Sequence, residues 1–353
     1  MRQPSALAAV VSVISVAFCA SCALAGPPGS SPDYDFDWVT IGDVANPAYG
    51  GDSNPSQNYP FGRGSVGYSY RIARTEVTTA QWVEFMNTFT TQAGIDAFSS
   101  DWSAPVQWGA FRYRNPAGPG IVYRLENYAE AAQQPVAGIS WRQAARFCNW
   151  LHSGKSSSPS SLVSGAYDTT TWGGGFGTGM PATDAERRLP GARFWIPSID
   201  EWVKSAHYDP DRFGPGQGGY WQFPNRSNVP PISGLPGVGE SSIDTNVWRI
   251  PVGSFPLTRS AYGLLDLSGG PREWLEDVYE HGRFYSRFTD GSSTNPTDPG
   301  TYLLDEIRDF GAGYANLGAG LVGLRVVTIP EPSFLGFAAA GFGVAGRRRR
   351  SLP

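Results

Sequence analysis

The residues best placed to do chemistry lie between Gly263 and Asp277, where two carboxylates flank a Gly-Gly-Pro turn. Asp266 precedes this turn, at 269–271, and Glu273 follows it. Such a turn can direct both carboxylates and several main-chain carbonyls at one point, which is the arrangement that a hard cation requires. The alternative is a tight turn before a short helix, in which both carboxylates are solvated or capping groups. The stretch by itself leaves both interpretations open.

Other side chains with catalytic potential are scarce. Cys19 and Cys22 lie within residues 1–25, so only Cys148 would remain after removal of this segment, and no internal disulfide could form. A thiol on the apolar face of a helix, as we expect for Cys148, is usually an inert core residue. The three histidines are far apart and lack the spacing of metal ligands: His152, His207 and His281. No local Ser, His and Asp motif indicates a hydrolase, although a triad assembled in space stays open.

The composition favours a loop-rich globular protein. The 353 residues are 41% hydrophobic and 16% charged, which is enough to bury a sizeable core in one large or two ordinary domains. The 44 glycines, 29 prolines and 12 tryptophans predict irregular backbone held by aromatic side chains, with few long helices. The net charge of -4 argues against a nucleic-acid partner, because such a surface needs clustered Lys and Arg.

The N-terminus has the pattern of a secretory signal peptide. Arg2 precedes an apolar run at 6–20, and Ala-Leu-Ala at 23–25 supplies a signal-peptidase site before Gly26. We therefore expect residues 1–25 to be removed by signal peptidase and the mature chain to begin at Gly26. A lipoprotein interpretation through one of the first two cysteines is weaker, because the usual Leu three residues earlier is missing.

The C-terminus has the pattern of a second targeting signal. Pro-Glu-Pro at 330–332 is followed by an apolar segment at 333–346 and by four arginines at 347–350. This order resembles the PEP-CTERM sorting signal of bacterial exosortase systems. The 14 apolar residues are fewer than the roughly 20 of a spanning helix, so contact with the membrane would be transient. The resemblance implies that residues 330–353 are a sorting signal cleaved by exosortase, leaving the protein secreted or at the cell surface; a short anchor is the alternative.

Between these two terminal signals the predicted strands are few and short. Apolar alternation predicts strands over 38–41, 66–72 and 193–197. The Ser-, Thr- and Gly-rich stretch 155–191 indicates a surface insertion. The middle of the chain is expected to be loop held by aromatic residues: Trp102, Trp108, Phe111 and Tyr113. No internal repeat is present.

Three helices have sequence signals at their start. Thr78 or Thr79 is expected to cap the first, whose apolar residues recur at spacings of three and four: Trp82, Phe85, Met86 and Phe89. Capping boxes open the other two, and they are formed by Ser140 with Gln143 and by Ser198 with Glu201. Cys148 falls on the apolar face of the second helix, as the core interpretation of its thiol requires.

Five segments, in the same order, resemble the formylglycine-generating enzyme (sulfatase-modifying factor) family: 76–82, 135–150, 196–202, 263–277 and 323–325. The resemblance covers about residues 38–328 and implies a single domain at 26–329. It also implies an α+β fold, a loop-rich variant of the C-type-lectin fold with short helices and small antiparallel sheets. The composition points to the same kind of structure.

The resemblance implies a chemistry that this sequence lacks. Authentic members oxidise a substrate cysteine with copper and oxygen, and hold the metal on a pair of cysteines shortly before a Gly-Phe-Arg-like motif. Soft thiolates are what Cu(I) requires. The corresponding stretch here, 302–324, contains no cysteine. We therefore expect neither copper nor formylglycine production.

Several functions stay open on the sequence. We favour a non-catalytic, calcium-stabilised binding or structural module, whose extracellular ligand is a protein or a polysaccharide. An alternative is an oxidoreductase of the same superfamily that uses a non-cysteine site, although the three-histidine iron constellation of such relatives is missing. The variable ligand-binding proteins of similar fold would need an aromatic-rich C-terminus, which the sorting signal at 330–353 replaces.

The resemblance also implies calcium sites. The family motif Gly-Leu-Tyr-Asn/Asp-x-x-Gly-Asn-x-x-Glu-Trp binds Ca²⁺, and it matches the stretch that starts at Gly263. Position by position, it assigns two carboxylates and two carbonyls as ligands: Asp266, Gly269, Pro271 and Glu273. This sequence departs from the motif at 270–272, where Arg272 brings a positive charge that would weaken binding if it pointed inward. A second family site matches side chains of Asn228 and Asp244 with carbonyls of Val229 and Asn246.

Overall fold

The computed structural model describes residues 32–51, 61–89, 103–114, 121–172, 187–281, 284–290, 310–313 and 321–329. The predicted signal peptide, 1–25, and the predicted sorting signal, 330–353, lie outside these ranges, as does Trp102. Within the described part, no helix is both long and apolar enough to span a membrane.

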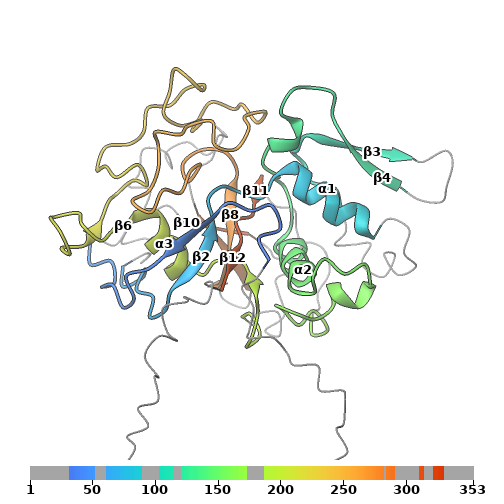
Figure 1. The fold of residues 1–353 in the computed structure, drawn as a ribbon, viewed down its shortest axis with the longest axis horizontal. Helices are drawn as coiled ribbons and strands as arrows, with labels where there is room; N and C mark the ends of the chain where they lie inside the picture. Colours follow the sequence, from blue (N-terminus) through green and yellow to red (C-terminus); the bar gives the residue numbers. More distant parts are fainter. Residues whose placement is uncertain are drawn as a thin grey trace, which may run out of the picture. The chain divides into compact units, whose positions relative to one another are not determined.

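One four-stranded sheet joins segments that are far apart in the sequence. Its strands are β1 (Trp38–Ile41), β2 (Tyr70–Ala73), β12 (Val327–Thr328) and β5 (Phe194–Trp195), in that order. All three pairings are antiparallel. Figure 1 shows β12 beside β2, so the two ends of the described chain meet in one sheet.

A second four-stranded sheet begins directly after the Gly-Gly-Pro turn. Its order is β10 (Phe310–Gly313), β9 (Phe284–Asp290), β8 (Arg272–His281) and β11 (Val322–Gly323). β11 pairs with β8 in parallel, and this pairing places Gly323 opposite Glu273. The alternative of a short helix after the turn is therefore wrong, because ladder pairing on both sides of β8 holds this segment extended.

The three helices begin at their predicted caps. α1 (Thr79–Thr88), α2 (Trp141–His152) and α3 (Ile199–His207) each have both bonds of the box, with Thr78, Ser140 and Ser198 as the caps. Single-turn 3₁₀ helices occupy Ala131–Gln133 (η2) and Pro159–Leu162 (η3). The second of these lies in the described part of the predicted surface insertion.

Aromatic packing between α1 and α2 forms much of the core. Trp82 of α1 stacks on Phe147 of α2 with ring centroids 5.1 Å apart, and Phe85 meets Phe147 edge-on at 5.2 Å. The predicted stripe of the first helix is fully buried, which confirms it as core. Short helices, small sheets and long loops make this an α+β structure, as expected.

The middle of the chain differs from the expectation of a loop. β3 (Ala110–Arg114) and β4 (Ile121–Leu125) pair as an antiparallel hairpin that packs on α1 through β4 (Figure 1). Phe111 is 39% exposed, so it does not hold a loop in place as predicted. A further pair, β6 (Tyr208–Asp209) with β7 (Gly219–Tyr220), follows α3.

Candidate functional site

A buried ion pair lies at the centre of the predicted cation stretch. Arg325, which is 0% exposed, donates from Nε to both carboxylate oxygens of Glu273 at 2.8 and 3.1 Å. Its Nη2 is 2.7 Å from Glu273 Oε1, and the indole of Trp202 donates to Oε2 at 2.8 Å. Because a carboxylate has about four lone-pair positions, these contacts engage most of the acceptor capacity of Glu273.

The same guanidinium also fixes two loops. Its Nη1 donates to the carbonyls of Ala73 and Arg74 at 3.0 and 2.6 Å. Its Nη2 donates to the carbonyl of Leu265 at 2.9 Å and, more weakly, to that of Asp266 at 3.4 Å. Arg325 thereby ties the end of β2 to the stretch that precedes the turn, and it positions Asp266.

Asp266 has a strained backbone and a partly buried carboxylate. Its φ is 54°, in the left-handed region that few side chains adopt. One carboxylate oxygen accepts a hydrogen bond from the N–H of Gly253. Burial raises the pKa of Asp266 to about 6, although the Gly253 bond and the charge of Arg325 oppose this shift. The side chain is held in one orientation towards the loop that contains Gly253.

Glu76 brings a third carboxylate from a different part of the chain. It is 2% exposed, and its Oε2 has no hydrogen-bond partner within the described residues. The nearest cation is Nη2 of Arg325 at 3.9 Å. Burial, followed by the nearby charge of Asp266, raises the pKa of Glu76 well above its ordinary value. Sequence analysis missed this residue as part of the site, since no local spacing relates it to the turn.

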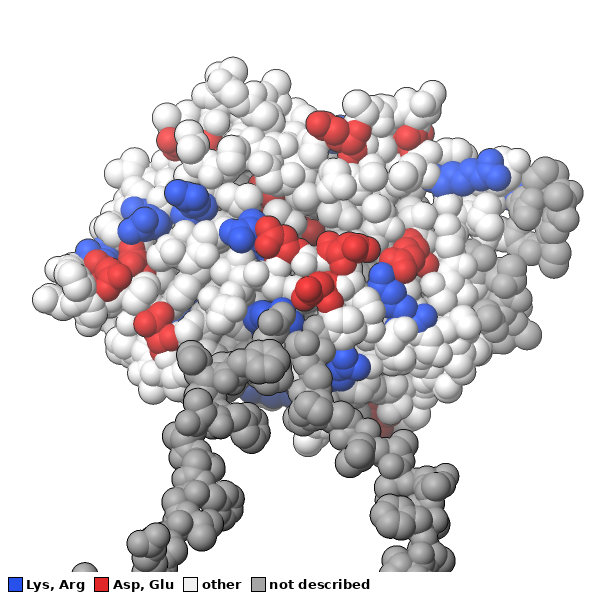
Figure 2. Space-filling view, viewed as in Figure 1, with Lys and Arg blue, Asp and Glu red and all other residues white. Residues whose placement is uncertain are grey.

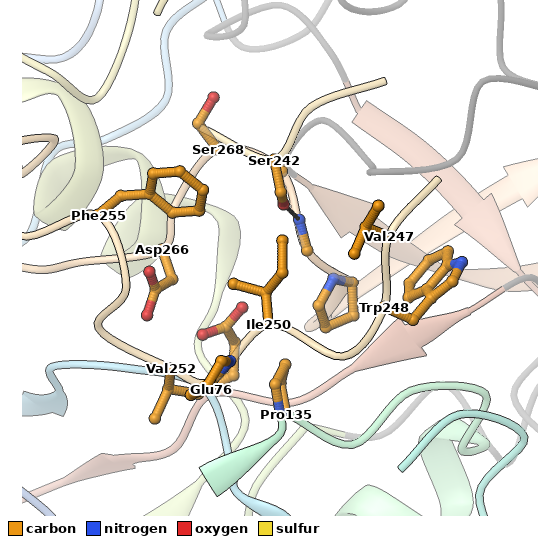
Figure 3. Close-up of a pocket in the computed structure, with 14 residues that line it drawn as sticks. Glu76, Pro135, Ser242, Val247, Trp248, Ile250, Val252, Phe255, Asp266 and Ser268 are labelled. Carbon is orange, nitrogen blue, oxygen red and sulfur yellow. Dashed lines mark hydrogen bonds between the residues drawn. The ribbon is translucent and has the colours of Figure 1, made fainter. Parts of the chain in front are cut away.

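Glu76 and Asp266 face one pocket, which is shown in Figure 3. The pocket is small, with an enclosed volume of about 20 Å³, and it is partly open to solvent. Gly269, Gly270 and Pro271 of the turn also line it. Its walls are otherwise largely apolar: Pro135, Trp248, Ile250, Val252 and Phe255. The site therefore places two carboxyl groups and the residues of the turn within largely apolar walls.

The structure brings three of the four residues of the first predicted calcium site together. Asp266, Gly269 and Pro271 line the pocket, whereas the Glu273 carboxylate is turned towards Arg325 and Trp202. Oxygen donors of this kind suit a hard cation and not copper. The described residues contain no cluster of three or more His, Cys, Asp or Glu side chains in metal-binding geometry.

The second predicted set is spread over exposed loops. The amide oxygen of Asn228 accepts from Arg212 at 3.3 Å and from the N–H of Gln222 at 3.2 Å. Asp244 and Asn246 both have positive φ, of 56° and 55°. Within the described part of the chain, no hydrogen bond joins Asn228 to Asp244 or to Asn246.

The remaining catalytic candidates do not converge. Cys148 is 0% exposed, and burial raises the pKa of its thiol well above the ordinary value, so it is a core thiol as expected. His152 accepts from the N–H of Arg193 at 3.1 Å. His207 lies 3.1 Å from the carbonyl of Trp221, and burial lowers its pKa to about 3. The His281 side chain lies outside the described set.

A second buried charge cluster connects β8 with α3. Arg188 pairs with Glu276 at 2.8 Å and with Glu201 at 3.2 Å. Burial raises the pKa of Glu276 to about 7, while Arg188 lowers it in part. The Glu201 carboxylate also completes the capping box of α3. The ion pairs of Arg188 and the capping bond of Glu201 account for these buried charges as structural contacts.

Comparison with known proteins identifies a family and solved structures of low sequence identity. Residues 39–303 match the family described as "Sulfatase-modifying factor enzyme 1-like domain". The mouse (Mus musculus) protein "Inactive C-alpha-formylglycine-generating enzyme 2" is 27% identical over 192 residues, which are 54% of this chain and 45% of that protein. The chain thus spans less than half the length of this curated relative.

Two solved structures align over most of this chain at low sequence identity. CarF gives a TM-score of 0.48 with 17% identity, over 84% of this chain and 100% of that one. Treponema denticola variable protein 1 gives a TM-score of 0.49 with 17% identity, over 84% of this chain and 95% of that one.

Proposed function

Because the chain belongs to the sulfatase-modifying factor enzyme 1-like family, we propose that it is a non-catalytic member of that family. Its role is then to bind a ligand, or to build structure, at the cell surface or in the extracellular matrix of a bacterium. One observation carries the proposal: the stretch 302–324 has no cysteine, and the thiol of Cys148 is fully buried. The name of the mouse relative, which describes an inactive enzyme, is in keeping with this.

The proposed fold is the loop-rich variant of the C-type-lectin fold. Short helices, small sheets and the pairing of β12 with β2 are in keeping with it. In such a fold, long loops present the ligand surface, and the pocket beside Asp266 lies among the 242–271 loops. We infer that the extracellular ligand is a protein or a polysaccharide.

Export and surface sorting complete the proposal. Signal peptidase removes 1–25, the domain 26–329 remains, and exosortase acts at the 330–353 signal. The sequence patterns at both ends support these assignments. Intact-mass measurement of the exported protein from its native host tests them. A mature chain that begins near Gly26 and lacks Arg347–Arg350 supports the assignment, whereas arginines retained on the exported protein refute it.

Calcium is the proposed structural ion, and copper is not proposed. At the first site, Asp266 supplies the carboxylate, and Gly269 and Pro271 supply carbonyls. Glu273 contributes the acceptor capacity that remains after its carboxylate has paired with Arg325. The second site, at Asn228, Val229, Asp244 and Asn246, is proposed on sequence spacing alone.

Metal analysis of the purified protein tests the functional class. Calcium at a stoichiometric level, without copper or iron, is expected for a structural module. Stoichiometric copper or iron would instead support an oxidoreductase.

A further inference from the structure

The β3–β4 hairpin has positively charged side chains that form no ion pair within the described chain. Its strands contain three arginines, Arg112, Arg114 and Arg124, and no Asp or Glu. None of the three forms an ion pair with a described residue. In a chain with a net charge of -4, this makes a local basic surface, visible as blue side chains over the hairpin at the upper right of Figure 2.

One edge of the hairpin is covered by α1. The side-chain amide of Asn87 donates to the carbonyl of Tyr123 at 2.9 Å, and the N–H of Tyr123 donates to Asn87 Oδ1 at 2.8 Å. Both outward main-chain groups of Tyr123 are thus satisfied by a side chain. The outer edge of β4 is therefore closed to another strand at this point.

The outer edge of β3 is open by the same geometry. Tyr123 lies opposite Arg112, and residues opposite each other in an antiparallel ladder either exchange both main-chain bonds or none. Since Tyr123 uses its groups on Asn87, Arg112 must point its own N–H and C=O away from β4. The N–H of Glu126 donates to the carbonyl of Gly109 at 2.8 Å, so these two residues form a hydrogen-bonded pair. Because such pairs alternate with non-hydrogen-bonded pairs along the ladder, Arg112 again falls at a non-hydrogen-bonded position. The main-chain N–H and C=O of Arg114, two residues further on, also point outward. No described residue forms a hydrogen bond with the outward main-chain groups of Arg112 or Arg114.

The arginine side chains are arranged along this open edge. Arg112 and Arg114 are two residues apart, so both side chains lie on one face of β3. Arg124 lies on the opposite face, where its guanidinium stacks on the ring of Tyr113 at 3.7 Å. An added strand would place every second side chain beside Arg112 and Arg114.

We propose that the open edge of β3 binds an extended segment of a partner protein that has carboxylates at alternate positions. Its main chain would continue the ladder at the outward groups of Arg112 and Arg114. Its carboxylates would pair with the two guanidiniums, which present planar donors suited to carboxylates. The same charges repel a second copy of β3, so the edge selects an acidic partner over self-association.

A labelled acidic peptide tests this proposal on the purified protein. The probe has about ten residues, with Glu alternating with Thr, and binding is followed by fluorescence anisotropy. The double variant Arg112→Gln/Arg114→Gln should weaken binding by roughly tenfold, since two exposed ion pairs are lost. The matched control Arg124→Gln removes the same kind of charge from the opposite face, and it should change binding by less than about threefold. Binding should also weaken as salt is raised.

A second probe separates ladder pairing from charge alone. The same peptide, N-methylated at alternate residues so that one edge cannot donate, should bind roughly tenfold more weakly. If the methylated peptide binds as well as the parent, or if Arg124→Gln has the full effect, the proposed edge is wrong. Binding of a polyuronate without binding of the peptide would also overturn it, in favour of a polysaccharide surface.

Discussion

Replacing Arg325 with Met should destabilise the protein strongly, because it removes a buried cation that several carboxylates share. The substitution keeps a long apolar side chain but leaves the carboxylates of Glu76, Asp266 and Glu273 without this positive charge. Removing one partner of a buried ion pair costs about 3–5 kcal/mol. The loss of donors to four main-chain carbonyls adds to this cost. We therefore expect a loss of about 5 kcal/mol, a large part of the stability of an ordinary domain.

Urea unfolding, followed by tryptophan fluorescence in the presence of chelator, measures this loss. Arg188→Met is the matched control, because that arginine also pairs with two carboxylates but its side chain is 22% exposed. It should cost clearly less. In the double variant Arg325→Met/Glu273→Gln, part of the loss should return, about 1–2 kcal/mol, since the carboxylate that pairs directly with Arg325 no longer leaves an uncompensated charge. A cost below about 1 kcal/mol for Arg325→Met would refute the role assigned to this ion pair.

Two further predictions concern protons and calcium. The pKa of Glu276 is about 7 in the folded protein against an ordinary 4.5, so its proton stabilises the fold below pH 4.5 and this contribution is lost as the pH rises through 7. Relative to Glu276→Gln, the parent protein should lose about 3 kcal/mol of unfolding free energy between pH 4.5 and 8; parallel stability curves would contradict this. Calcium at a hundredfold excess over its dissociation constant should stabilise the protein by about 2.7 kcal/mol, and Asp266→Asn should remove most of this increment. Equal melting curves in calcium and chelator, for protein shown to be metal-free, would exclude the site.

Local sequence signals predicted the helices well. The boxes of Ser140 with Gln143 and of Ser198 with Glu201 satisfy main-chain donors within one turn, so spacing alone identifies them. The β3–β4 hairpin was missed, although alternating residues on both sides of the Gly- and Pro-rich stretch 115–120 could have indicated it. Its strands are short, and the structure alone shows which of their residues pair.

The site was predicted in part for a related reason. Asp266 and the turn are neighbours in sequence, so one stretch identified them. Glu76 and Arg325 reach the same place through the pairing of β2 with β12, which no local pattern encodes. Glu273 was expected to face a cation, and it does face one, but that cation is the guanidinium of Arg325.

The central claim, that this family member is non-catalytic, is tested most directly by an activity assay. The purified protein is incubated with a sulfatase-type peptide that contains the substrate cysteine, with and without copper, and the product is analysed by mass spectrometry. The missing cysteines at 302–324 and the buried thiol of Cys148 predict no formylglycine above a control without protein. Formylglycine that accumulates with time and with protein concentration would contradict the account.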